Sequence, residues 1–325
     1  MKKIISILTL ITAILCFPAC KKGGESLSVY APDGAPALAL SYAIDNCNDG
    51  IDYNIVASDV IVTKVTGENP TADIAIVPIN VASLYLGDGS VYKILGSITH
   101  GNFYFLSKTE GEITRQNAQN LKGKTIGVVQ LPNIPGLTLK ATLNDLGVPY
   151  NELVNGAQKV SDKVNLLAIK PVEVGVIDCD YYLAPSPAAD VKAESLSLNF
   201  VGDLGKLYGE NGFPQAVIVA KKSVLDSDFD KVKTVINGIK ESENYLKIDN
   251  KTAICQAIMK SIESGLTPSF TEKNLTENAI KRSSIKFVSA NNSRAEIELF
   301  LLKIKGINPN AVKVLSEEFW FKGEF

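Results

Sequence analysis

Histidine, cysteine and tryptophan are scarce in this sequence. Its 325 residues include one His, one Trp, two Met and five Cys. A single histidine, His100, supports neither a Ser-His-Asp arrangement nor an HExxH zinc motif, and no P-loop sequence occurs. We therefore expect no cofactor and no metal site, and the groups needed for catalysis are poorly supplied.

The body of the chain also lacks a large excess of either charge and lacks long apolar runs. The 33 basic and 35 acidic residues nearly balance, so nothing favours a nucleic-acid partner. After residue 19, no apolar run approaches the roughly 20 residues that a membrane-spanning helix needs. A composition of 46% hydrophobic and 21% charged residues is that of an ordinary globular protein.

The three cysteines after residue 20 do not indicate a disulfide framework. Cys47, Cys179 and Cys255 are odd in number, widely spaced and without a CxxC pair, which indicates neither a disulfide scaffold nor a zinc site. We interpret them as buried thiols. One pair could still form in an oxidising compartment, and the sequence does not choose which.

The first twenty residues have the layout of an export signal. Lys2 and Lys3 precede a short apolar run, and a small residue, Ala19, stands before Cys20. The segment Phe17-Pro18-Ala19-Cys20 resembles the lipobox of bacterial lipoproteins, with Phe17 where Leu is usual. That resemblance implies a signal peptide over 1–19, a lipid on Cys20 as membrane anchor, and a tether over 20–27. An ordinary secretory signal, in which Cys20 is incidental, is the alternative.

Removal of 1–19 would leave about 306 residues, with 31 basic against 35 acidic, enough for two lobes of about 100 to 200 residues each. Strands and helices alternate along this body, which predicts an α/β architecture with largely parallel sheets. The expected strands lie at 28–31, 72–78, 103–106, 124–129, 181–184 and 216–220. We place lobe 1 at 28–107 and 215–325, the latter mostly helical, and lobe 2 at 108–214.

Several segments together resemble the solute-binding lipoproteins of ABC importers, in the group that includes nitrate, sulfonate and thiamine-precursor binders. The resemblance spans the mature chain, and one departure is Pro185-Ser186-Pro187, where family members often have Pro-Glu-Pro. The segments that carry it are Asp33-Gly34-Ala35-Pro36, 72–78, 121–126, 182–189 and 213–216.

The resemblance implies two Rossmann-like lobes of the periplasmic binding protein type 2 fold, which close on a ligand between them. In open α/β sheets, ligands bind beyond the carboxyl ends of strands. The residues expected at such ends, or on aromatic faces suited to a planar solute, are Asp33, Gly34, Ala35, Pro36, Asn80, Thr99, His100, Gln130, Asn133, Tyr181, Tyr182, Ser186, Phe213 and Gln215.

Several of these residues have two interpretations. Asp33 either contacts a ligand amine or hydroxyl, or caps the helix that begins near Pro36. Tyr181, Tyr182 and Phe213 either stack on a planar heterocycle or pack in the core. Tyr181 and Tyr182 point to opposite faces of one strand, so at most one of them faces the ligand. His100 is either at the mouth of the cleft or a surface or packing residue.

We therefore expect an exported, lipid-anchored monomer on the periplasmic or cell-surface side of a bacterial membrane. It would bind a small solute without chemistry and deliver it to ABC permease and ATPase subunits. The solute could be a pyrimidine, a sulfonate, another anion or a heterocyclic precursor, and the aromatic residues favour a planar heterocycle. The alternatives are an adhesion or sensing lipoprotein and an enzyme of the same fold, similar to the thiamine pyrimidine synthase or the futalosine-pathway enzymes.

Overall fold

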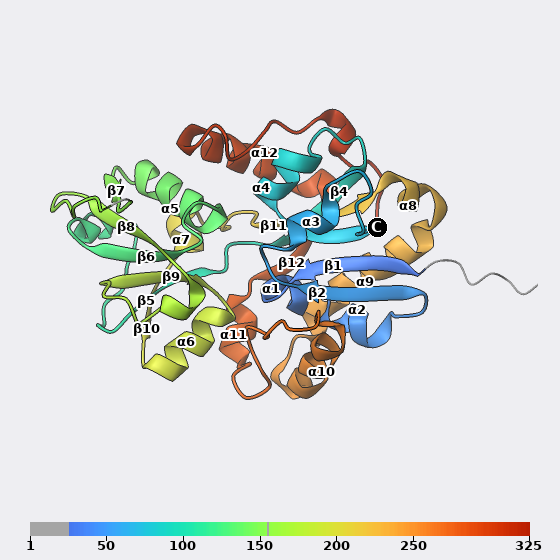
Figure 1. Cartoon of the computed structure of the whole chain (residues 1–325), viewed down its shortest axis with the longest axis horizontal. Coiled ribbons are helices and arrows are strands. Elements are labelled where there is room, and N and C mark those ends of the chain that lie inside the picture. Colours follow the sequence, from blue (N-terminus) through green and yellow to red (C-terminus); the bar gives the residue numbers. More distant parts are fainter. Residues whose placement is uncertain (1–25, 155) are drawn as a thin grey trace, which may run out of the picture.

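The computed structural model describes residues 26–154 and 156–325, which form two α/β lobes lying side by side (Figure 1). Each lobe is built on a sheet of six strands. The two-lobed α/β architecture expected from the alternation of strands and helices is confirmed. The expected signal peptide, 1–19, and the expected lipid site, Cys20, lie outside the described residues.

The sheet of the first lobe has the order β12-β4-β11-β3-β1-β2. Its central strands are apolar throughout because both faces are covered. Ile74 and Ile76 face one hydrophobic core, whereas Ala75 and Val77 face the other. The strands are β1 (Leu27–Pro32), β2 (Ile51–Val56), β3 (Ile74–Pro78), β4 (Tyr92–Thr99), β11 (Ala216–Lys221) and β12 (Ile285–Ser289). The helices of this lobe are α1 (Ala35–Ala39), α2 (Ser41–Asn46), α3 (Ile61–Val65), α4 (Ile79–Val81), α8 (Lys222–Ser227), α9 (Phe229–Tyr245), α10 (Lys251–Ser261), α11 (Glu277–Arg282) and α12 (Ala290–Ile307).

The sheet of the second lobe repeats the design, with the order β10-β5-β9-β6-β8-β7. The strands are β5 (Phe103–Ser107), β6 (Thr125–Val129), β7 (Tyr150–Glu152), β8 (Val164–Ile169), β9 (Tyr181–Pro185) and β10 (Asn199–Asp203). The helices of this lobe are α5 (Ile134–Asp145), α6 (Ala188–Leu196) and α7 (Leu204–Tyr208).

Both sheets are mixed and not largely parallel as expected, and β12 in the first sheet runs antiparallel to β4. Each sheet also contains an antiparallel strand that the chain supplies on crossing from the other lobe. β11 runs antiparallel between β3 and β4, and β5 runs antiparallel between β9 and β10. The expectation that 103–107 belongs to the first lobe is wrong, because β5 lies in the second sheet. The chain therefore leaves the first lobe at 100–102. An apolar strand buried on both faces carries no local signal for the sheet it joins.

Two crossing segments, 100–102 and 209–215, connect the lobes, and they touch each other. Gly101 and Gly212 have φ angles of 71° and 72°, in the left-handed region that favours glycine. A Cβ on Gly212 would lie 2.8 Å from the carbonyl oxygen of His100, and one on Gly101 would lie 3.0 Å from the Phe213 ring. Both crossings therefore depend on the absence of a side chain.

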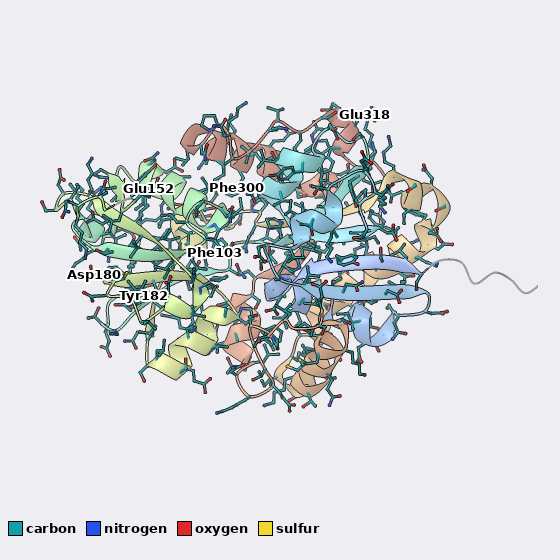
Figure 2. The ribbon with its side chains drawn as sticks, viewed as in Figure 1. Phe103, Glu152, Asp180, Tyr182, Phe300 and Glu318 are labelled. Carbon is teal, nitrogen blue, oxygen red and sulfur yellow. The ribbon has the colours of Figure 1, made fainter. Side chains whose placement is uncertain are left out.

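The hydrophobic core continues from one lobe to the other beside the crossings. The Phe213 ring stacks on Phe300 of α12 and on Phe103 of β5, with centroid distances of 5.5 and 5.9 Å. Figure 2 shows Phe103 and Phe300 near the middle of the molecule. The C-terminal helices were expected to cover the first lobe, but α12 also packs on α5 of the second lobe. Lys303 on α12 pairs with Asp145 on α5 at 2.6 Å.

Within the described ranges, Cys47, Cys179 and Cys255 are free thiols, and only Cys255 is fully buried. No helix among the described residues is long and apolar enough to cross a membrane.

Candidate functional site

Polar residues line up along the carboxyl edge of the first sheet. Continuing the pairing of Tyr30 with Ala75 by three residues places Asp33 opposite Pro78, where β3 ends. Asn80 follows at once on α4. On the next strands, Ala216 pairs with both Pro78 and Thr99. Asp33, Asn80, Gln215 and Thr99 therefore form one row across four adjacent strands.

The second sheet presents a matching row. Continuing the pairing of Val128 with Leu183 by two residues places Gln130 opposite Pro185. Phe103 pairs with Pro185, so Asn102 lies opposite Ser186. The backbone N–H of Ser186 donates to the carbonyl of Asn102 at 2.9 Å. We call the two rows together the interlobe seam, which consists of Asp33, Asn80, Thr99, Gln215, Gln130, Ser186 and Asn102.

Asn102 and Gln215 connect the two rows at the crossings. The backbone N–H of Gln215 donates to the carbonyl of Thr99 at 2.9 Å, and the carbonyl of Gln215 accepts the N–H of Ile79 at 3.0 Å. The side-chain Oε1 of Gln215 accepts the N–H of Asn102 at 3.2 Å. The side-chain Nδ2 of Asn102 donates to the carbonyl of Ser186 at 2.6 Å. The side chains of Gln215 and Asn102 thus connect the two rows of the seam by hydrogen bonds.

Asp33 is held by a distant loop. Its Oδ2 accepts the backbone N–H of Ser269 at 2.7 Å. The interpretation of Asp33 as a helix cap is wrong, because Gly34 is the N-cap of α1 and no side chain caps that end. Burial raises the pKa of Asp33, and the hydrogen bond from the Ser269 N–H opposes part of that rise. Asp33 therefore holds the 262–276 loop against the end of β1.

Buried polar atoms without partners concentrate at the seam. In the described part of the chain, such atoms include Asp33 Oδ1, Asn80 Oδ1, Thr99 Oγ1, Asn102 Oδ1 and the neighbouring Ser269 Oγ. Buried polar groups nearly always have a hydrogen-bond partner, so a group of exceptions in one place indicates a ligand or ordered water. Similar atoms elsewhere are scattered over other elements, in Ser41, Thr125, Thr138, Thr142 and Trp320.

An ion pair joins the lobes beside the seam. Arg282, at the end of α11 in the first lobe, pairs with Asp190 on α6 in the second lobe at 2.6 Å. The Asp190 side chain is only 7% exposed, and its other oxygen accepts the hydroxyl of Ser186 at 2.6 Å. The Arg282 guanidinium also lies 3.7 Å from the centre of the Phe200 ring.

The aromatic residues expected to face a planar solute do not lie at the seam. Tyr182 and Phe213 are fully buried, and the Tyr182 hydroxyl donates to the carbonyl of Ile177 at 2.6 Å. Tyr181 starts β9, about 13 Å before Pro185 at the strand's carboxyl end. Figure 2 shows Tyr182 well inside the second lobe. These side chains pack in hydrophobic cores, because both tyrosines stand at the amino end of their strand and Phe213 lies inside the interlobe stack.

The remaining predicted residues lie in three places: beside β12, before α5 and at the start of α1. His100 faces β12, where its ring nitrogen lies 3.1 Å from the carbonyl of Lys286 and 3.3 Å from Ser97 Oγ. Burial lowers the pKa of His100. Gln130 and Asn133 have exposed side chains before α5. Gly34 is the N-cap of α1 next to Ser269, and Ala35 and Pro36 are the first residues of that helix. The sequence reasoning missed Arg282, Asp190 and Ser269.

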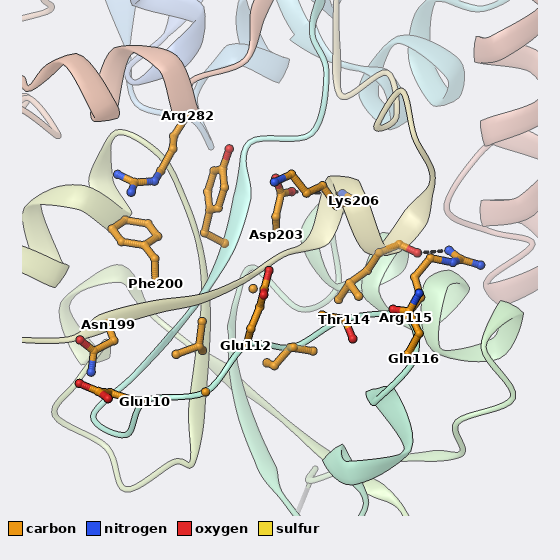
Figure 3. A pocket seen from close by; sticks show the side chains of 16 residues that line it. Glu110, Glu112, Thr114, Arg115, Gln116, Asn199, Phe200, Asp203, Lys206 and Arg282 are labelled. Carbon is orange, nitrogen blue, oxygen red and sulfur yellow. Dashed lines mark hydrogen bonds between the residues drawn. The ribbon is translucent and has the colours of Figure 1, made fainter.

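A hollow of about 670 Å³ opens elsewhere, over β10 and the 110–116 segment, with Arg282 among its lining (Figure 3). Its walls mix Glu110, Glu112 and Asp203 with Arg115 and Lys206. None of the buried polar atoms that lack a partner among the described residues belongs to its lining. The hollow runs along the whole of the edge strand β10 and contains none of the partnerless atoms, so we favour the seam as the functional site.

No group of three or more His, Cys, Asp or Glu side chains in the described ranges is arranged to hold a metal ion.

No family model matches the sequence, and no curated protein matches it. Solved structures do resemble the fold. An ABC transporter from Parabacteroides distasonis is 16% identical with a TM-score of 0.67, covering 92% of this chain and 100% of that one. The periplasmic aliphatic sulphonate binding protein SsuA from Escherichia coli is 12% identical with a TM-score of 0.60, covering 93% and 95%. DSZB in complex with biphenyl-2-sulfinic acid is 12% identical with a TM-score of 0.53, covering 88% and 93%.

These similarities show the fold. The chain has the two-lobed architecture of periplasmic solute-binding proteins, including those of ABC importers.

Proposed function

We propose that the protein is the solute-binding component of an ABC importer. The observation that carries the proposal is the set of buried, partnerless polar atoms where the carboxyl edges of the two sheets meet. A solute at this place would touch both lobes and both crossings. By binding the closed arrangement better than an open one, it would shift the population towards closure. The fold shared with ABC-importer proteins supports the same role.

The proposal includes export and a lipid anchor on Cys20. The basic start, the short apolar run and Ala19-Cys20 support it. Expression of the full chain in bacteria with labelled palmitate is expected to label the protein, and Cys20→Ser should abolish labelling and release the protein from the membrane. Labelling that persists in Cys20→Ser would contradict an anchor at this residue.

We propose binding and not catalysis. His100, the only histidine, is engaged with Ser97 and the Lys286 carbonyl, so it does not activate a nucleophile at the seam. Catalysis is the alternative to test, because DSZB, which has a similar fold, has been solved with biphenyl-2-sulfinic acid bound. A bound compound recovered chemically unchanged would support binding, and its conversion during incubation would support an enzyme.

The test uses the released Cys20→Ser protein, purified without denaturation. Native mass spectrometry is expected to detect a co-purified solute, and small-angle scattering should show a smaller radius of gyration with the solute than after its removal. A solute present at 100 times its dissociation constant should stabilise the protein by about 2.7 kcal/mol. A protein that carries no solute and has one unchanging shape would favour a sensing or adhesion lipoprotein.

A further inference from the structure

We infer that the seam selects a solute that donates hydrogen bonds and carries no negative charge on the part facing Asp33 and Asn102. Amines, amidines and aminopyrimidine-like compounds belong to this class, whereas sulfonates and nitrate do not. The inference rests on the proposed solute-binding role and names the class of solute.

Asn102 supplies the first acceptor. Its Nδ2 donates to the carbonyl of Ser186 at 2.6 Å, which fixes the orientation of the amide, because a carbonyl oxygen can only accept. The Oδ1 atom is consequently the partnerless one, in a side chain that is 2% exposed. A solute N–H or O–H at this position would remove the cost of leaving a buried acceptor unsatisfied.

Asp33 supplies the second acceptor. Its Oδ2 is occupied by the Ser269 N–H, and its Oδ1 is buried and meets no donor from the described residues. An ionised carboxylate can only accept hydrogen bonds. Ser269 Oγ and Thr99 Oγ1 are also buried without partners, and as hydroxyls they can adapt to either type of solute group. The fixed atoms are therefore acceptors.

Positive charge for an anionic solute is not available from the seam residues themselves, since none of the seven is Lys or Arg. Arg282 reaches the second lobe beside Ser186, but Asp190 neutralises it and Phe200 covers it. Burying an anion without a paired cation is strongly unfavourable. An anion at the seam would also face Asp33.

Asp33 stands at the free end of the first row, and Asn102 stands where the two rows join. β1 and β4 are separated by β3 and β11 in the sheet, so Asp33 and the end of β4 stand about 14 Å apart at the usual strand spacing. Asn102 follows β4 by three residues. A two-ring solute or a short chain with donors at both ends would meet both acceptors, whereas a single-ring probe would meet one of them.

The test is isothermal titration of the Cys20→Ser protein with four probes: benzamidine, 4-aminopyrimidine, ethanesulfonate and nitrate. We expect binding of at least one donor probe and of neither anion. Asp33→Asn keeps an oxygen for the Ser269 N–H but removes the charge, and it should weaken the cationic probe at least tenfold. Asp59→Asn, at an exposed position of the first lobe, is the matched control and should leave affinity unchanged.

The outcomes separate the two proposals. Binding of ethanesulfonate or nitrate with lobe closure, strengthened in Asp33→Asn, would overturn the inference and leave the solute-binding role intact. Binding of a donor probe that Asp33→Asn does not change would also overturn it. Binding of no probe, together with no co-purified solute in native mass spectrometry, would count against the solute-binding role and the inference with it.

Discussion

Arg282 and Asp190 join the two lobes through a 2.6 Å contact between a guanidinium nitrogen and a carboxylate oxygen, although 92 residues separate them. The Arg282 side chain is 28% exposed, whereas Asp190 is almost fully enclosed. The same carboxylate receives the Ser186 hydroxyl from the seam. The contact between the lobes is thus linked through Asp190 to the candidate site.

Arg282→Gln is expected to destabilise the protein by about 2 kcal/mol or more, because it leaves the Asp190 carboxylate buried without its partner. The lobes should also separate, which small-angle scattering would detect as a larger radius of gyration. The double variant Asp190→Asn with Arg282→Gln should recover part of the lost stability.

The control for this prediction is Lys124→Gln. Lys124 pairs with Asp180 at 3.2 Å within one lobe, and both side chains are exposed by more than a third. Such a pair contributes about 0 to 1 kcal/mol, and its loss should not change the shape. An equal effect of the two substitutions would contradict a special role for the interlobe pair.

Asp33→Asn is expected to stabilise the solute-free protein at neutral pH. Burial raises the folded-state pKa of Asp33, so the stability it contributes is complete below about pH 4 and is lost as the pH rises through that raised pKa. The asparagine resembles the neutral form. Urea unfolding should show the variant to be more stable at pH 7, with the difference shrinking towards pH 4. A variant that is less stable at pH 7 would show that the charge of Asp33, and not only an oxygen acceptor, is needed to hold the 262–276 loop.

Phe213→Leu should reduce stability and leave solute affinity unchanged. Phe213 is fully buried between Phe103 and Phe300, and removing a large part of a core aromatic ring creates a cavity. Full truncation of a core Phe typically costs about 3 to 5 kcal/mol, so we expect about 1 to 3 kcal/mol for leucine. Chemical unfolding measures the first effect and calorimetry the second. A loss of solute affinity with unchanged stability would show that Phe213 contacts the solute.

Gly212→Ala should be destabilising by more than about 1 kcal/mol. The added Cβ would meet the His100 carbonyl oxygen at 2.8 Å, and the φ angle of 72° is unfavourable for alanine. Gly265→Ala is a suitable comparison, because its φ of 87° is also positive but nothing lies within 4 Å of its Cβ position. Thermal unfolding of both variants separates the clash from the backbone strain. Equal losses would show that the contact between the crossings contributes little.

The strands and the ends of strands were predictable because their signals are local. Apolar runs such as 74–78 and 216–220 contain no polar residue that could form a solvated face, and turn residues adjoin the run 216–220. The position of Asp33, Asn80, Thr99, Gln130, Ser186 and Gln215 along the sheet edges was predictable because each lies next to a strand end, whereas their role in binding stays a prediction.

The errors arose where a residue's type and its neighbours in sequence suit two environments equally. Phe213 stands between Gly212 and Pro214 in a crossing segment, yet the segment runs through the interlobe stack and buries the ring. Tyr181 and Tyr182 belong to a correctly predicted strand but to its amino end. The 103–107 strand was expected in the first lobe, since its apolar pattern suits either sheet.

The chain's own sequence determined the two-lobed α/β design, the positions of six of the twelve described strands and the polar character of the strand ends, because periodicity and turn chemistry act over a few residues. Tertiary structure decided which partners meet: Ser269 with Asp33 across 236 positions, Arg282 with Asp190, and Asn102 with Ser186. It also decided which polar atoms are left buried without a donor. Such pairings depend on how the lobes fold against each other, and a hydrogen bond or ion pair between distant segments leaves no periodic trace in the sequence.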